Sequence, residues 1–237
     1  VELLDAEESM ALISLDRDAG NLQVRLMPQR PRFTAQVDVE VWLNGRTVEE
    51  RYRLQCEPET ARLDRVVVWL SQRRESPLNW ILETESAIRV SSRRWTSDEQ
   101  LAAGLSTEGE VWEIQINPPA VESLVLTASR ESPFGERMIP SLASVPDAET
   151  QTGRLAIRAI PGEAVRIENV RLRPTPSEPL PADRFTTMLA AYRYDPWREV
   201  GRLGEPGLTV AAHATEQALP AMIWNATLDS RYDADGA

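Results

Sequence analysis

Apolar and polar residues alternate most regularly between residues 33 and 56. The alternating apolar positions of the first half are Phe33, Ala35, Val37, Val39, Val41 and Leu43. A period of two is typical of a strand with one buried face. Asn44-Gly45 follows, a dipeptide that favours a two-residue hairpin turn, and a second alternating run continues to Cys56. The segment therefore predicts an antiparallel β-hairpin.

The predicted turn also sets the pairing of side chains across the hairpin. With Asn44-Gly45 as the two turn residues, Asp38 would face Arg51 on the outer surface, which is a favourable pair. Glu40 would face Glu49, which is a repulsive pair. On the inner surface every position is apolar except Glu50.

Further short strands are predicted at regular intervals, separated by Pro, Gly, Ser and Asn. They are Met10–Leu15, Leu22–Met27, Arg65–Leu70, Leu78–Thr84, Ile88–Arg93, Val111–Asn117, Leu124–Ser129, Arg154–Ile160 and Val165–Leu172. Many short strands with turn signals between them favour an all-β fold. We expect an antiparallel β-sandwich, immunoglobulin-like or larger, with at most one or two short helices.

Two segments have helical features. Ser97 to Gln100 matches a capping box and Gly104 can end the helix, which predicts a short connecting helix. Farther along, the spacing of Phe185, Met188, Leu189 and Tyr192 fits an amphipathic helix. The same region also permits a strand from Met188 to Tyr194, which we favour because Asp195-Pro196 follows directly and the surrounding segments are β.

A proline-rich segment suggests a domain boundary. Residues 174–181 contain four prolines, which favour an extended, semi-rigid chain. We therefore expect a β-sandwich domain at residues 1–173, a linker at 174–181, and the start of a second, incomplete β domain at 182–237. The alternative is a proline-rich crossover between the sheets of a single sandwich.

Charge and composition limit the classes of partner. The 237 residues include 26 basic residues, all arginine, and 37 acidic residues, so the net charge is −11. Such a field repels nucleic acid and anionic lipid, and exclusive use of arginine suggests a GC-rich bacterial genome. The longest apolar run, Val66–Leu70, is too short for a membrane span. From the two ends of the sequence we expect a fragment of a larger exported protein, located in the periplasm or at the cell surface.

Few residues suggest catalysis or metal binding. His213 is the only histidine and Cys56 the only cysteine, so neither a histidine-based triad nor a structural zinc site is predicted. Cys56 lies on the inward side of the hairpin, which favours a buried thiol. Asp233 and Asp235 resemble part of a calcium loop, but Arg231 occupies the first ligand position. We predict no catalytic residues, no metal and no cofactor.

Tryptophan is the one residue type whose abundance suggests binding. Of the seven tryptophans, the pattern places Trp69, Trp80, Trp112 and Trp224 in the core. Trp42, Trp95 and Trp197 are candidates for exposure, and exposed aromatic rings on a β-sandwich can stack on sugar rings. The alternative is that these three pack against a second layer or a neighbouring domain.

Three functions remain from the sequence alone. The first is a non-catalytic structural or interaction region that contacts neighbouring domains of its parent protein. The second is a carbohydrate-binding module that uses Trp42, Trp95 and Trp197. The third is a glycoside hydrolase that uses two carboxylates, for which Glu83 with Glu85 or Glu108 with Glu110 offer neighbouring acids.

Overall fold

The computed structural model divides the chain into two compact units, residues 1–30 and 31–237. It describes residues 31–59, 62–83, 87–135, 137–160, 165–169, 172–175, 187–196 and 208–212, all of them in the second unit. The strands expected at Met10–Leu15 and Leu22–Met27 lie outside the described residues. So do Trp197, His213, Trp224 and the aspartates near the C-terminus.

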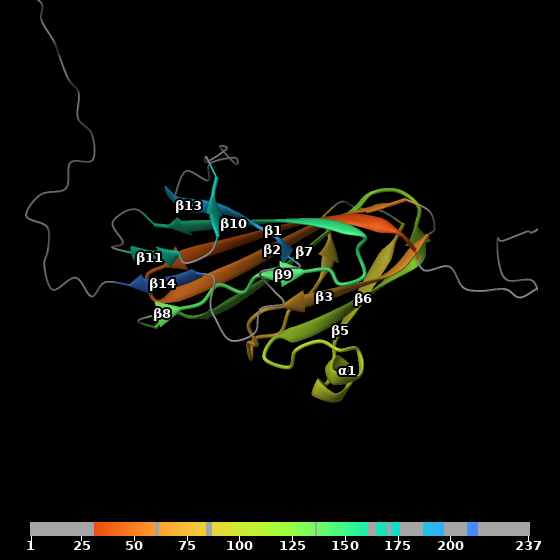
Figure 1. Ribbon diagram of the computed structural model, residues 1–237, viewed down its shortest axis with the longest axis horizontal. Helices are drawn as coiled ribbons and strands as arrows, with labels where there is room; N and C mark the ends of the chain where they lie inside the picture. The colour runs from red at the N-terminus through yellow and green to blue at the C-terminus, as the bar shows by residue number, and fades with distance from the viewer. Residues whose placement is uncertain are drawn as a thin grey trace, which may run out of the picture. The chain divides into compact units, whose positions relative to one another are not determined.

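The largest sheet has seven strands (Figure 1), in the order β12-β13-β10-β1-β2-β7-β4. Its long strands are β1 (Phe33–Asn44), β2 (Thr47–Pro58), β7 (Leu124–Pro133), β10 (Thr150–Ala159) and β13 (Thr187–Tyr194). The two short edge strands are β12 (Arg173–Pro174) and β4 (Ile81–Leu82). Neighbouring strands are antiparallel except β1 and β10, which pair in parallel.

Two smaller sheets accompany the large one. The four-stranded sheet has the order β5-β6-β3-β9, with β5 at Arg89–Arg94, β6 at Glu110–Ala120, β3 at Leu63–Leu70 and β9 at Ala143–Ser144. The three-stranded sheet has the order β11-β14-β8, with β11 at Val165–Asn169, β14 at Leu208–Ala212 and β8 at Arg137–Met138. A single helix, α1 (Ser97–Ala102), follows β5 among the described residues.

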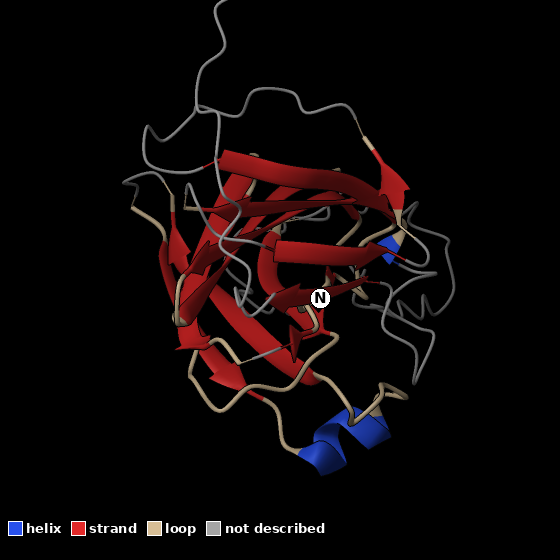
Figure 2. Ribbon diagram, turned by 90° about the vertical axis from the view of Figure 1, so that its left-hand side faces the viewer, coloured by secondary structure: helices blue, strands red, loops and turns tan. Residues whose placement is uncertain are grey.

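The expected all-β class is confirmed. Strands make up 63% of the described residues and helix 5%, and Figure 2 shows the strands in red. The seven-stranded and four-stranded sheets contribute to one hydrophobic core, which is what makes the fold sandwich-like. Trp69, Trp80 and Trp112 are buried in it, as predicted, and so is Cys56. In the described part of the chain, no helix is long and apolar enough to cross a membrane.

The hairpin is confirmed, but its predicted register is wrong by two residues. Asn44 pairs with Thr47, so Gly45, with φ of 60°, and Arg46 form the turn. The shift leaves the same side chains facing the core, because side chains alternate with a period of two. It changes the outer pairs, since Glu40 now faces Arg51 and no longer Glu49. The observed register therefore removes the one repulsive pair that the predicted register contained.

Both segments with helical features have a clear outcome. The short helix is present and Gly104 follows it with φ of 73°, as expected. Its capping box starts one residue earlier than predicted, because Thr96 is the N-cap and the Glu99 carboxylate accepts the reciprocal hydrogen bond from the Thr96 backbone N–H. The strand interpretation of residues 188–194 is confirmed by β13.

The position of β13 differs from the expected domain boundary. This strand follows the proline-rich segment, yet it pairs with β10 along Gly153–Ala159 and with β12 at Arg173–Pro174. Residues 187–194 therefore extend the same sheet as the hairpin. Proline ends a strand without preventing the chain from returning to the same sheet, so the composition of 174–181 could not distinguish a linker from a crossover.

A charged network lies in the core between the two larger sheets. Glu50 on β2, Arg130 on β7 and Glu110 on β6 are each at most 4% exposed. The Arg130 side chain donates to both carboxylates, with 2.9 Å from Nε to Glu50 Oε2. Arg130 Nη2 also donates to the Tyr52 hydroxyl at 3.0 Å.

Two further groups contact the Glu50 carboxylate. The backbone N–H of Ser141 donates to Glu50 Oε1 at 2.9 Å, and Arg74 Nη2 lies 3.4 Å from the same oxygen. Burial by itself would raise the pKa of Glu50, but the charges of Arg130 and Arg74 and the Ser141 hydrogen bond lower it below 4.5. Glu50 is therefore a buried, ionised carboxylate that ties β2 to β7 and to the loop before β9.

We expect Arg130→Met to unfold much more readily than Arg65→Met. Removal of Arg130 leaves two buried carboxylates without their shared cation, a loss of about 3–5 kcal/mol. Arg65 pairs with Asp147 at 3.8 Å with both side chains more than 40% exposed, so its loss costs about 0–1 kcal/mol. Urea unfolding of both variants measures the difference, and equal losses would contradict a stabilising role for the buried network.

Candidate functional site

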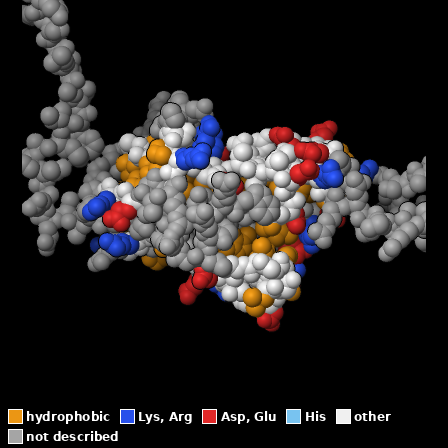
Figure 3. All heavy atoms as spheres, in the orientation of Figure 1, with side chains coloured by type: hydrophobic (Ala, Val, Ile, Leu, Met, Phe, Trp, Pro, Cys, Tyr) orange, Lys and Arg blue, Asp and Glu red, His pale blue; other side chains and the backbone are white. Residues whose placement is uncertain are grey.

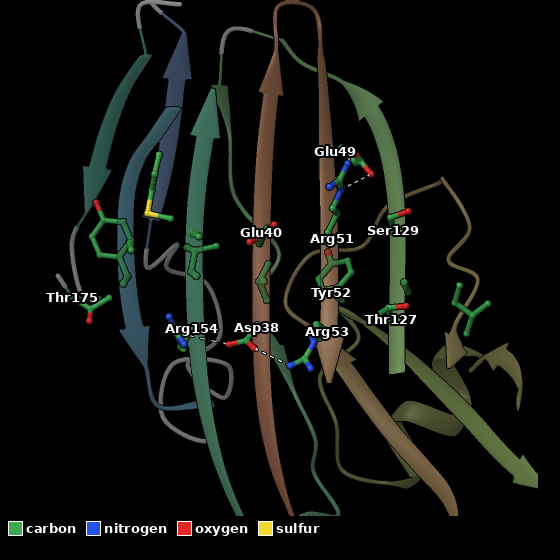
Figure 4. A pocket seen from close by; sticks show the side chains of 18 of the residues that line it. Asp38, Glu40, Glu49, Arg51, Tyr52, Arg53, Thr127, Ser129, Arg154 and Thr175 are labelled. Atoms are coloured by element: carbon green, nitrogen blue, oxygen red, sulfur yellow. Dashed lines mark hydrogen bonds and ion pairs between the residues drawn. The ribbon is translucent and has the colours of Figure 1, made fainter. Parts of the chain in front are cut away.

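A trough lies on the outer face of the seven-stranded sheet (Figure 4). Its volume is about 690 Å³. The charged residues that line it are Asp38, Glu40, Glu49, Arg51, Arg53 and Arg154, and the uncharged polar ones include Asn79, Thr127, Ser129 and Thr175. This size is within the range of small-molecule sites in proteins, roughly 300–1,000 Å³. The trough is therefore the candidate functional site.

Strand alternation explains why these residues share one surface. Val37, Val39 and Val41 of β1 face the core, so Asp38 and Glu40 between them face outward. The same parity brings outward residues of neighbouring strands into rows across the sheet. One row runs from Arg154 on β10 through Asp38 to Arg53 on β2.

Asp38 occupies the middle of that row. Its carboxylate lies 3.7 Å from Arg53 Nη1 and 3.9 Å from Arg154 Nε, and Figure 4 shows it between the two guanidiniums. Both distances exceed a hydrogen bond, and the Gln36 amide donates to the carboxylate at 3.2 Å. Burial raises the pKa of Asp38 above 3.8, although the Gln36 hydrogen bond and both arginines act in the opposite direction.

Arg53 is held by a second acid. Its guanidinium donates to the Glu83 carboxylate through Nε at 3.1 Å and Nη2 at 3.0 Å. This bidentate arrangement orients the plane of the guanidinium beside Asp38. Arg53 is thus positioned from two sides before any ligand arrives.

A second row of outward residues contains Glu40. Arg51 faces it from β2, and Arg51 is also held by two 2.8 Å hydrogen bonds to Glu49. On the other side Glu40 is next to Ala156 of β10, which is next to Ala191 of β13. Because alanine has only a methyl side chain, these two adjacent alanines leave a hollow in the sheet surface, and both line the trough. Met188 and Ile81 add apolar side chains to the lining.

Trp42 lies beside the trough but is already engaged. Its indole N–H donates to Glu40 at 3.0 Å. The Arg51 guanidinium lies 4.0 Å from its ring centroid and that of Arg158 lies 5.5 Å away. These are cation–π distances, so the ring packs against arginines of both neighbouring strands.

Of the three candidate tryptophans, the structure places Trp42 in one sheet and Trp95 directly after a strand of another. Trp95 is half-buried against the core, and its indole N–H donates to Glu113 at 2.7 Å. It follows β5 of the four-stranded sheet, whereas Trp42 belongs to the seven-stranded sheet. Trp197 lies outside the described residues. The use of these three tryptophans in carbohydrate binding stays a prediction.

Of the acid pairs considered from the sequence, the structure describes both members of one, Glu108 with Glu110, and these two lie in different environments. Glu110 is fully buried in the charged network, whereas Glu108 is exposed. Glu83 is occupied by Arg53, and Glu85 lies outside the described residues. Within the described ranges, no group of three or more His, Cys, Asp or Glu side chains is arranged to hold a metal ion.

Sequence reasoning missed the trough, although part of its signal was visible. The outward acids and arginines of β1 and β2 follow directly from the alternation between residues 33 and 56. Arg154, Ala156 and Ala191 could not be added, because nothing local shows that β10 pairs with β1 or that β13 pairs with β10. Acidic and basic side chains also lie on other parts of the described surface (Figure 3). The sequence alone therefore does not distinguish the charged residues of the trough from the other charged surface residues.

Comparisons with known proteins give little further information. No family model matches the sequence, and no curated protein is similar to it. A provisionally named protease from Parabacteroides distasonis superposes with a TM-score of 0.42 at 7% identity, over 78% of this chain and 41% of that one. An M1 zinc metallopeptidase from Deinococcus radiodurans gives 0.28 at 12% identity, over 77% and 43%. The chain thus spans about two fifths of each protein, and similarities this weak carry no functional argument.

Asp38 should titrate at a pH above that of a solvated aspartate. A raised pKa in the folded state means that ionised Asp38 opposes folding. The free energy of unfolding therefore falls as the pH rises from 3.8 through the folded pKa of Asp38. We expect carboxyl ¹³C NMR to show this raised pKa. Asp38→Asn should remove the corresponding part of the pH dependence of unfolding. A titration below 3.8 would contradict this assignment and show that the arginines outweigh burial.

Proposed function

We propose that this chain is a non-catalytic β-sandwich interaction module of a larger exported bacterial protein. Neighbouring domains of the parent protein hold the module in place, and the trough is the surface that it presents to a ligand. The acidic net charge of −11 makes nucleic acid an unsuitable partner. The location outside the cytoplasm is part of the proposal.

The observation that carries the proposal is the trough of about 690 Å³ itself. Its floor consists of outward side chains from β1, β2, β7, β10 and β13, which are hydrogen-bonded neighbours in one sheet. A paired sheet holds side chains in fixed relative positions, which is the requirement for a preorganised binding surface. The charged groups are also held by each other, as Glu49 holds Arg51.

A cysteine-labelling experiment tests both the location and the availability of the trough. Ser129 is exposed and lines the trough, whereas Ala102 is exposed at the end of α1. We would label Ser129→Cys and Ala102→Cys in the complete gene product on intact cells with a small, membrane-impermeant maleimide. The native Cys56 should not react with the maleimide, because it is buried and burial raises the pKa of its thiol to about 12.

We expect both introduced cysteines to react on intact cells while the unmodified protein does not. Protection of Ser129→Cys alone would mean that another part of the parent protein covers the trough, which would overturn its role as a ligand site. Reaction of both only after cell lysis would overturn the location outside the cytoplasm.

A glycoside hydrolase is a second candidate, because the outer face of β1 carries two neighbouring carboxylates, Asp38 and Glu40, that both line the trough. Asp38 would be the general acid, since burial raises the pKa of this carboxyl, and Glu40 would be the second carboxylate. Hydrolysis of chromogenic glycosides by the wild type, Asp38→Asn and Glu40→Gln tests this candidate. We expect no turnover by any of the three. Activity in the wild type that either substitution removes would instead support the hydrolase and overturn the non-catalytic proposal.

A further inference from the structure

We propose that the trough binds a neutral oligosaccharide through its paired acids and arginines, and not through a tryptophan platform. This inference rests on the proposed function, because it requires a trough that is open to a ligand. It names the class of ligand and the residues that would recognise it.

The charge of the lining favours a neutral ligand. Asp38, Glu40 and Glu49 are balanced by Arg51, Arg53 and Arg154, so the formal charges of the lining cancel. The chain as a whole carries −11. A polyanion or polycation would meet as many repulsive as attractive groups in the trough, whereas a neutral polar ligand would meet donors and acceptors in equal supply.

The spacing within these charge pairs suits hydroxyl groups. Asp38 lies 3.7–3.9 Å from its two arginines, and Arg158 Nε lies 3.8 Å from Glu40 Oε1. These ion pairs are too long to be hydrogen bonds. A hydroxyl group both donates and accepts, so it can donate to the carboxylate and accept from the guanidinium at the same time. Neighbouring hydroxyls of a sugar ring present several such groups at short intervals.

A donor without a hydrogen-bond partner lies next to the trough on Arg158, which is not itself a lining residue. The Arg158 side chain is only 4% exposed. Its Nε has no hydrogen-bond partner among the described residues. A buried donor without a partner costs free energy, and a ligand hydroxyl in the trough would recover that cost if the Arg158 side chain turned toward it. Arg158 pairs with Met188 of β13 and with Trp42 of β1, directly beside the row that contains Glu40.

The shape and the apolar part of the lining fit a sugar ring. Ala156 and Ala191 form the hollow beside Glu40, and Met188 and Ile81 provide apolar contacts. Sugar rings carry apolar C–H faces between their hydroxyl groups, so a site with a polar floor and some apolar walls is complementary to them. By contrast, the Trp42 ring is packed against Arg51 and Arg158, which leaves it poorly placed to stack on a ligand.

The test is binding to a panel of neutral and charged oligosaccharides, followed by calorimetric titration of the best ligand. Ala191→Leu fills the hollow, and Ala102→Leu on α1 is the matched control for the same substitution at an exposed site. Trp95→Phe removes the indole N–H but keeps an aromatic ring, so it tests whether the polar group of Trp95 contributes to binding. Thermal unfolding of each variant shows that it is folded.

We expect a neutral oligosaccharide to bind, and Ala191→Leu to weaken its binding roughly tenfold or more. Ala102→Leu and Trp95→Phe should bind as the wild type does. The inference is overturned by the absence of neutral ligands at millimolar concentration, by a preference for charged glycans, or by binding that folded Ala191→Leu leaves intact. If Ser129→Cys remains reactive on cells while no glycan binds, the interaction module stands and only the ligand class is wrong.

Discussion

The sandwich depends on one buried arginine. Arg130 lies between Glu50 of the seven-stranded sheet and Glu110 of the four-stranded sheet, and it is almost fully excluded from solvent. Each of these charges would be strongly unfavourable in the core by itself. Without Arg130, Glu50 would keep only Arg74 as a cationic partner and Glu110 only Arg94, and both of these arginines are partly exposed. The Ser141 backbone N–H and the Tyr52 hydroxyl also donate hydrogen bonds to Glu50 in this network. A misaligned pair of sheets would leave these groups unsatisfied, so the network specifies how the two sheets pack.

The two faces of the same hairpin perform different tasks. On the inner face, Glu50 and Tyr52 take part in the buried network. On the outer face, Asp38, Glu40, Arg51 and Arg53 form the floor of the trough. Because the inner face anchors β2 to β7 and across to the second sheet, the outer side chains have a rigid base. The sheet can thus hold Asp38 a little beyond hydrogen-bond distance from Arg53 and Arg154.

Local patterns in the sequence predicted much of the inner architecture. Alternation identified the buried face of β1 and β2 and flagged Glu50 as its one charged residue. The partner could also have been found, because Arg130 continues the inward parity of Leu124, Leu126 and Ala128, one residue beyond the predicted end of that strand. The predicted register of the hairpin was wrong because Gly45 can occupy either position of a two-residue turn. Both Asn44-Gly45 and Gly45-Arg46 are locally acceptable turns. The outer charge pairs, and not the turn residues alone, favour the observed one.

By itself, the sequence determined the all-β class, the inward and outward faces of the strands, the short helix and the strand at residues 188–194. These features follow from the side-chain period of two, from capping and from backbone preferences, which act between residues close in the chain. Only the tertiary structure decided that β10 pairs in parallel with β1 and that β13 returns to the same sheet. It likewise decided that Ala156 and Ala191 hollow out the surface beside Glu40. Such contacts join residues far apart in the chain, and their energies depend on packing and charge pairing that no local pattern contains.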